Sequence, residues 1–155
     1  MPLFRPTRRA SFGLLASLPL VGLARPVWAA SPEVYADSGL ALGGTDPVAY
    51  FRQGEAVAGL TDYALMWRGA TWAFSTAETM EAFEMNPDAY APQFGGYCAY
   101  ALAHGSLSPT VPEAWTIYQD QLYLNYSLDV RQEWQADIPG YLAMAAPQWP
   151  AILQS

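Results

Sequence analysis

The chain has 155 residues, with 14 acidic and 7 basic side chains, no lysine and a single cysteine, Cys98. Four of the arginines lie within the first 29 residues and every acid follows Ser31, so the chain beyond residue 29 keeps three arginines and a net charge of −11. This balance excludes binding to nucleic acid, which needs clustered Lys and Arg, and disfavours anionic membrane surfaces. Without lysine, Schiff-base chemistry and lysine-dependent phosphate loops are excluded as well. Metal cations, basic proteins and neutral ligands remain as partners.

The first 29 residues have the pattern of an export signal. Arg5, Arg8 and Arg9 form a positive start, residues 12–24 are apolar, and Val27-Trp28-Ala29 has the pattern of a cleavage site. The apolar run is shorter than the roughly twenty residues that span a bilayer, so we expect no stable membrane anchor after cleavage. The arginine pair resembles a twin-arginine leader, and general secretion is the alternative. The expected partner is the export machinery, and the expected location is the bacterial periplasm.

We expect residues 30–44 to form a loose entry segment and residues 45–155 to form one folded domain. Thr45 or Asp46 caps a short helix that has Pro47 in its first turn and ends at Gly54. Strand-like runs follow at 63–67 and 71–74 and make a hairpin around residues 68–70. Ser75 or Thr76 then starts a helix with apolar residues at every third position, which Pro87 ends.

The second part of the domain predicts another hairpin and further helices. Residues 115–118 and 122–125 are the strands of that hairpin, and Ser127 caps a helix whose Trp134 faces the sheet. Ile138-Pro139-Gly140 interrupts this helix before residues 141–146 resume it. The predicted fold is α+β, a small antiparallel sheet of two hairpins with helices packed on one face.

These segments together resemble the exported branch of the YHS-domain proteins, some members of which are described as selenoproteins. The matching stretches are Asp46-Pro47-Val48-Ala49-Tyr50-Phe51, residues 67–75, Phe83, Asn86 to Cys98, residues 122–126 and Trp149-Pro150. The compact domains of this family resemble metal-binding modules that hold the metal through two cysteines. The corresponding positions here hold Ala49 and Ser75, so that site is not expected in this chain. Exported relatives resemble the chain in keeping a cysteine after Gly-Gly-Tyr, where Cys98 lies.

Cys98 cannot form an internal disulfide, so it is buried, bound, reactive or paired with another molecule. A helix over residues 97–104 would place Cys98 in its first turn, where backbone N–H groups stabilise a thiolate. A soft metal such as Cu(I) is then the candidate cofactor, with Met66 and His104 as candidate further ligands. His104 lies six positions from Cys98, and neither a regular helix nor a strand brings residues at that spacing together. Its alternative role is a helix C-terminal histidine.

Three hypotheses for function follow. The first is an exported, non-enzymatic protein that binds a soft metal through Cys98. The second is a thiol redox protein or sensor that uses Cys98, and the third is a module that binds a small ligand or a protein, with Cys98 structural. Four tryptophans, Trp67, Trp72, Trp115 and Trp134, are expected chiefly in the core, with the walls of a pocket as their alternative place. A serine hydrolase is not expected from a chain with one histidine and no Gly-x-Ser-x-Gly segment.

Overall fold

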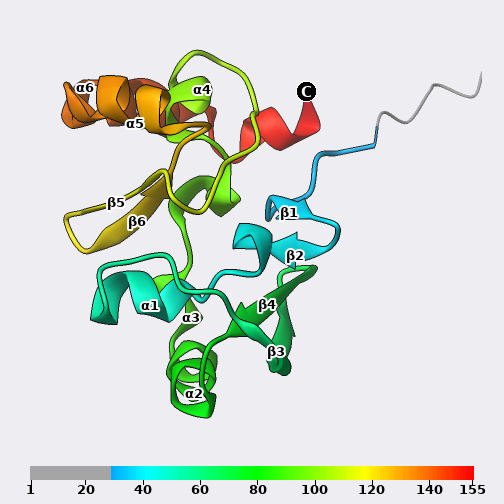
Figure 1. Ribbon diagram of the computed structural model, residues 1–155. Coiled ribbons are helices and arrows are strands. Elements are labelled where there is room, and N and C mark those ends of the chain that lie inside the picture. Colours follow the sequence, from blue (N-terminus) through cyan, green and yellow to red (C-terminus); the bar gives the residue numbers. More distant parts are fainter. Residues whose placement is uncertain (1–28) are drawn as a thin grey trace, which may run out of the picture.

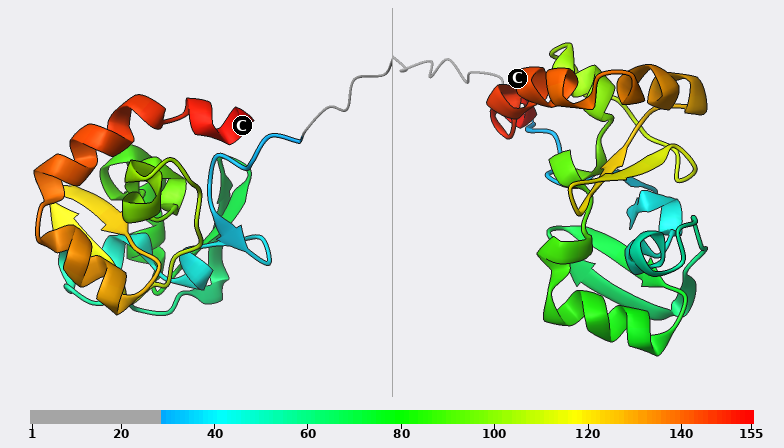
Figure 2. Two further views of the ribbon diagram at one scale, coloured as in Figure 1. Left: turned by 90° about the horizontal axis from the view of Figure 1, so that it is seen from above. Right: turned by 90° about the vertical axis from the view of Figure 1, so that its left-hand side faces the viewer.

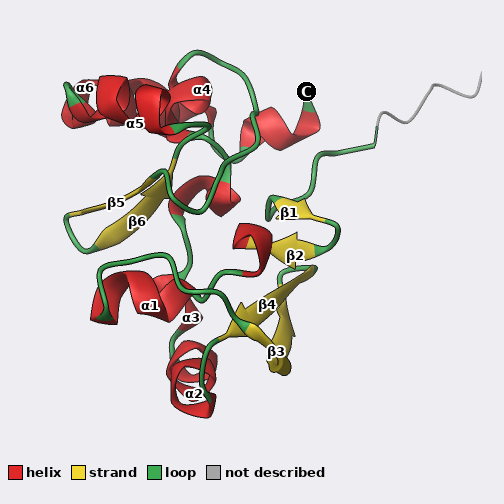
Figure 3. Cartoon of the chain, viewed as in Figure 1, coloured by secondary structure: helices red, strands yellow, loops and turns green. Residues whose placement is uncertain are grey.

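The computed structural model describes residues 29–155 and shows an α+β fold (Figures 1 and 3). Its elements form two halves. The sheet half, residues 36–90, holds a four-stranded sheet, three α-helices and the 3₁₀ turn η1 (Leu42–Gly44). The hairpin half, residues 93–154, holds a two-stranded hairpin with the remaining helices (Figure 2). Within residues 29–155, no helix combines the length and the apolar character needed to cross a membrane. The predicted export signal lies, apart from Ala29, outside the described residues and stays a prediction.

The four-stranded sheet is mixed rather than antiparallel. Its order is β1-β2-β4-β3, and β2 runs parallel to β4 through the pair Leu40 and Thr71. The Thr71 N–H donates to the Gly39 carbonyl at 3.0 Å. The strands are β1 (Ala36–Asp37), β2 (Leu40–Ala41), β3 (Leu60–Trp67) and β4 (Ala70–Phe74). Residues 30–44, which the sequence predicts as a loose entry segment, therefore contribute two strands, and Val34 and Leu42 of this segment are buried.

The second hairpin stays separate from this sheet. Strands β5 (Trp115–Tyr118) and β6 (Gln121–Leu124) pair with each other, and the end of β6 makes one parallel bridge to Cys98. The predicted single sheet of two hairpins is thus wrong, although the α+β class is confirmed. The two short strands β1 and β2 extend the sheet beside β4, while β6 packs on the 3₁₀ turn η2 (Gln93–Gly96) rather than on an edge of that sheet.

The helices of the sheet half begin where their capping residues predict. Asp46 caps α1 (Pro47–Arg52), and Thr76 caps α2 (Ala77–Met85) in a reciprocal capping box with Thr79. The short helix α3 (Pro87–Tyr90) follows at once, because Pro87 ends α2 and is accepted at the start of the next helix. On its inner face α2 buries Phe83 against Trp72, with ring centroids 5.0 Å apart.

The hairpin half carries α4 (Ala99–Ala103), α5 (Leu128–Gln135) and α6 (Ile138–Ala145). Ser127 caps α5 as predicted, and Trp134 of α5 is buried against Tyr123 of the hairpin, with centroids 5.3 Å apart. The prediction that residues 138–140 interrupt the helix is wrong in detail. They form the first turn of α6, which Asp137 caps, because proline in a first turn lacks only an N–H that has no helical partner there.

A buried carboxylate joins three elements of the sheet half. Asp46 is 0% exposed, and its Oδ1 accepts from the N–H groups of Val48, at 2.9 Å, and Ala49, at 3.4 Å. Its Oδ2 accepts from the Ser75 N–H at 2.8 Å, the Ser75 hydroxyl at 2.7 Å and the Thr79 hydroxyl at 2.7 Å. The start of α1, the end of β4 and the first turn of α2 therefore depend on one side chain.

Replacing this carboxylate tests its importance. Asp46→Asn turns one acceptor oxygen into an NH₂ donor that faces the Ser75 N–H, so we expect a loss of about 3 kcal/mol of unfolding free energy. Urea unfolding followed by circular dichroism measures it. The matched control is Asp137→Asn at the exposed cap of α6, where Asn caps as well as Asp and the loss stays below about 0.5 kcal/mol. Equal losses of unfolding free energy in the two variants would show that the buried carboxylate of Asp46 stabilises the fold no more than an exposed helix cap does.

Candidate functional site

The structure encloses Cys98. It lies at the N-cap of α4, directly before the first turn of the helix rather than within that turn as predicted, and only 1% of its surface is exposed. Its Sγ accepts from the N–H of Ala101 at 3.5 Å and of Tyr126 at 3.3 Å, and the Asn125 side-chain amide lies 3.9 Å away. The sulfur therefore caps α4 and holds the end of β6 against that helix.

The other predicted metal ligands do not join Cys98. Met66 is 72% exposed on β3, in the sheet half, whereas α4 lies in the hairpin half (Figures 1 and 2). His104 is the C-cap of α4, with its Nδ1 2.8 Å from the Tyr100 carbonyl oxygen and its ring centroid 4.4 Å from that of Tyr100, at a tilt of 37°. Within residues 29–155, no group of three or more His, Cys, Asp or Glu residues is placed to hold a metal ion.

The two positions that the resemblance assigns to metal cysteines lie together. The Ala49 N–H and the Ser75 hydroxyl both contact the carboxylate of Asp46. Since neither residue carries a sulfur, this place holds a hydrogen-bonded polar cluster with the Thr79 hydroxyl in it. Its chemistry here is structural.

A pocket of about 290 Å³ opens where the two halves meet, and we call it the seam pocket. Aromatic rings line it from both halves, with Trp67 and Trp72 from the sheet and Phe94 and Trp149 from the hairpin half. The two sets belong to larger ring clusters, since Trp67 lies 5.6 Å from Trp72, and Phe94 lies 6.1 Å from Trp149. The polar side chains of the lining are Glu33, Arg68, Asp88, Gln93 and Gln121.

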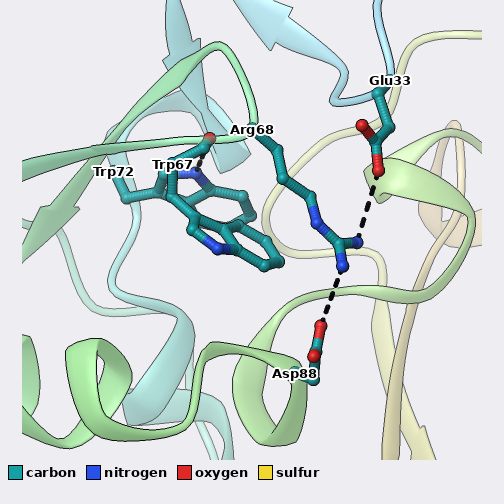
Figure 4. A network of polar contacts seen from close by, with 5 residues as sticks. All are labelled: Glu33, Trp67, Arg68, Trp72 and Asp88. Carbon is teal, nitrogen blue, oxygen red and sulfur yellow. Dashed lines mark hydrogen bonds and ion pairs between the residues drawn. The ribbon is translucent and has the colours of Figure 1, made fainter.

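Arg68 crosses the pocket lining and joins three segments (Figure 4). It belongs to the turn between β3 and β4, at a φ of 48°, and its guanidinium carbon lies 4.2 Å from the ring centroid of Trp67. Its Nη1 is 3.4 Å from Glu33 Oε1 and its Nη2 is 3.1 Å from Asp88 Oδ1. All three charged side chains are about half-exposed or more, so a ligand in the pocket can reach them.

Glycine at position 95 makes the seam possible. Gly95 has a φ of 62°, and a Cβ there would collide with the carbonyl oxygen of Glu33 and press on the ring of Trp149. The close approach is fixed by the Tyr35 N–H, which donates to the Gly95 carbonyl at 2.9 Å. Beside it, the Tyr97 hydroxyl donates to the carbonyl preceding Glu33, at 2.9 Å, and burial raises the pKa of Tyr97, which keeps the phenol protonated. Together these contacts place Glu33 at the pocket.

Reasoning from the sequence anticipates only part of this site. It names four tryptophans as possible pocket walls, of which Trp67 and Trp72 line the seam pocket and the other two do not. It assigns no role to Glu33, Arg68 or Asp88, and none to Trp149 as a wall. These residues come from segments far apart in the chain, and no local periodicity links them. The one available signal is an arginine in a tight turn directly after a tryptophan, a spacing that lets a cation lie over an aromatic ring.

Burial of Cys98 predicts slow chemical labelling. In the folded protein the thiol should react with a disulfide reagent only through opening of the structure, roughly a hundredfold slower than in urea. The matched control is Met66→Cys in a Cys98→Ser background, which presents one thiol at an exposed position and should label at the rate of a free cysteine. A folded-state rate for Cys98 equal to that of this control would contradict the buried placement.

Comparison with known proteins adds no relative: no family model, no curated protein and no solved structure matches the chain. The resemblance to exported YHS-domain proteins therefore rests on the quoted motifs. Of these, the structure gives Asp46 and Ser75 a shared hydrogen-bonded cluster, Gly95 a close backbone approach and Trp149 a place in the pocket wall.

Proposed function

We propose that this chain is an exported, non-enzymatic YHS-like protein that binds a small ligand in the seam pocket, with Cys98 serving a structural role. The observation that carries the proposal is the pocket itself. Ligand sites are concave, mostly walled by aromatic and apolar side chains, and contain a few convergent polar groups. The seam pocket has aromatic rings from both halves in its lining, most of its exposed surface is polar, and the charged groups of Glu33, Arg68 and Asp88 converge there.

The surroundings of Cys98 favour this module over the two thiol-based hypotheses. Binding of a soft metal needs further sulfur or imidazole ligands, and the predicted ones, Met66 and His104, lie elsewhere. The side-chain amide of Asn125 faces the sulfur with its NH₂ group, which donates a hydrogen bond and does not ligate Cu(I). A redox or nucleophilic thiol must meet its reactant, and a side chain 1% exposed does not. What remains for this sulfur is a structural role, because the hydrogen bonds it accepts cap α4 and hold the chain after β6 against that helix.

Small probes of different charge test the pocket. Choline, 3,3-dimethylbutan-1-ol and 3,3-dimethylbutanoate share a branched head of similar size, and we expect at least one of them to bind saturably by saturation-transfer NMR. Gln121→Trp fills the pocket from an exposed lining position and should abolish that binding. Glu84→Trp adds the same side chain on the exposed face of α2, outside the pocket, and should leave binding unchanged. The proposal fails if no probe binds, or if Gln121→Trp binds as well as the unaltered protein.

Copper titration tests the role given to Cys98. We expect the protein and its Cys98→Ser variant to take up Cu(I) with equal affinity against a competing chelator, because Cys98 is enclosed and lacks a second soft ligand. Serine at the same N-cap keeps an acceptor for the Ala101 N–H, so the variant should fold, which circular dichroism checks. Stoichiometric Cu(I) uptake that the serine variant loses would favour the metal-binding hypothesis instead.

A further inference from the structure

We infer that the ligand of the seam pocket is a small organic cation, and that the guanidinium of Arg68 occupies its place in the ligand-free protein. The inference rests on the proposed function. It starts from the groups that contact this guanidinium, which are an indole face and two carboxylates (Figure 4). That combination is the one that recognises ammonium and guanidinium ligands, because the ring quadrupole and the carboxylates attract the same positive charge.

The charge of the pocket favours a cation over an anion. Glu33 and Asp88 against Arg68 leave one net negative charge, and both terminal nitrogens of the guanidinium are engaged by a carboxylate. An anion would have to displace a carboxylate from Arg68 and would meet the other one nearby. Each carboxylate contributes one oxygen to Arg68, and its second oxygen makes no hydrogen bond to another of residues 29–155. These oxygens are acceptors for a positively charged ligand head.

Arg68 is held in a way that permits exchange. Its two ion pairs are between side chains 45% to 73% exposed, and such pairs are weak because water competes for both partners. The residue lies at the tip of the turn between β3 and β4, so its side chain can swing outward without moving the sheet. A ligand that brings its own cation to Trp67 and the carboxylates can therefore replace the guanidinium. The net charge of −11 beyond residue 29 also raises the local concentration of cations.

The three probes decide the charge of the ligand. Choline should bind more tightly than its neutral isostere 3,3-dimethylbutan-1-ol, and 3,3-dimethylbutanoate should bind weakest. Arg68→Asn removes the internal competitor and keeps a residue that accepts a positive φ, so it should bind choline roughly tenfold more tightly than the unaltered protein. Glu33→Gln together with Asp88→Asn should abolish the preference for choline over the alcohol. Circular dichroism confirms folding of each variant.

Arg131→Asn is the matched control. Arg131 also lies over a tryptophan, 5.7 Å from the ring of Trp115, but neither residue lines the seam pocket, so choline binding should not change. The inference is overturned if the alcohol or the acid binds as tightly as choline, or if Arg68→Asn weakens choline binding. In those cases the pocket still binds a ligand and the proposed function stands. Absence of binding by all three probes overturns both.

Discussion

The carboxylate of Asp46 is the interaction on which the sheet half depends. A buried carboxylate is costly unless its oxygens are hydrogen-bonded, and those of Asp46 accept five hydrogen bonds from three elements. Neither α1, β4 nor α2 can shift without leaving an oxygen or an N–H unpaired. Since β4 is held at its end, the turn that precedes it is also placed, and that turn carries Arg68 to the seam.

A second constraint joins the halves. The chain before β1 passes so close to Gly95 that no side chain fits between them, and the hydrogen bond from Tyr35 to that glycine closes the contact. This approach brings Glu33 from one end of the chain, Arg68 from the sheet and Asp88 from α3 to one point. The same approach places Trp149 in the wall of the pocket. The pocket is thus a product of assembling the two halves, and neither half contains it alone.

Tertiary packing decides which role the side chain of Cys98 can have. Local reasoning places it at a helix start and allows either a reactive thiolate or an inert core sulfur. The helix start is confirmed within two residues, because the Gly95-Gly96 break and the apolar run after it are local signals. Its exposure is decided by the chain just after β6, where the Tyr126 N–H donates to the sulfur from 28 residues away. No pattern around residue 98 contains that information.

Short-range rules of the amino-acid sequence account for the helix starts and the hairpins of this protein. Capping side chains set the starts of α1, α2 and α5, and period-two runs with tight turns set both hairpins. The motifs of the resemblance and the charge of the chain also required no structure. Tertiary structure decided the rest. Strands of two residues, such as β1 and β2, are too short to show a periodicity, and a parallel pair such as Leu40 and Thr71 joins residues 31 positions apart. The seam pocket likewise combines side chains from five segments, and only the folded backbone brings their charges and rings within contact distance.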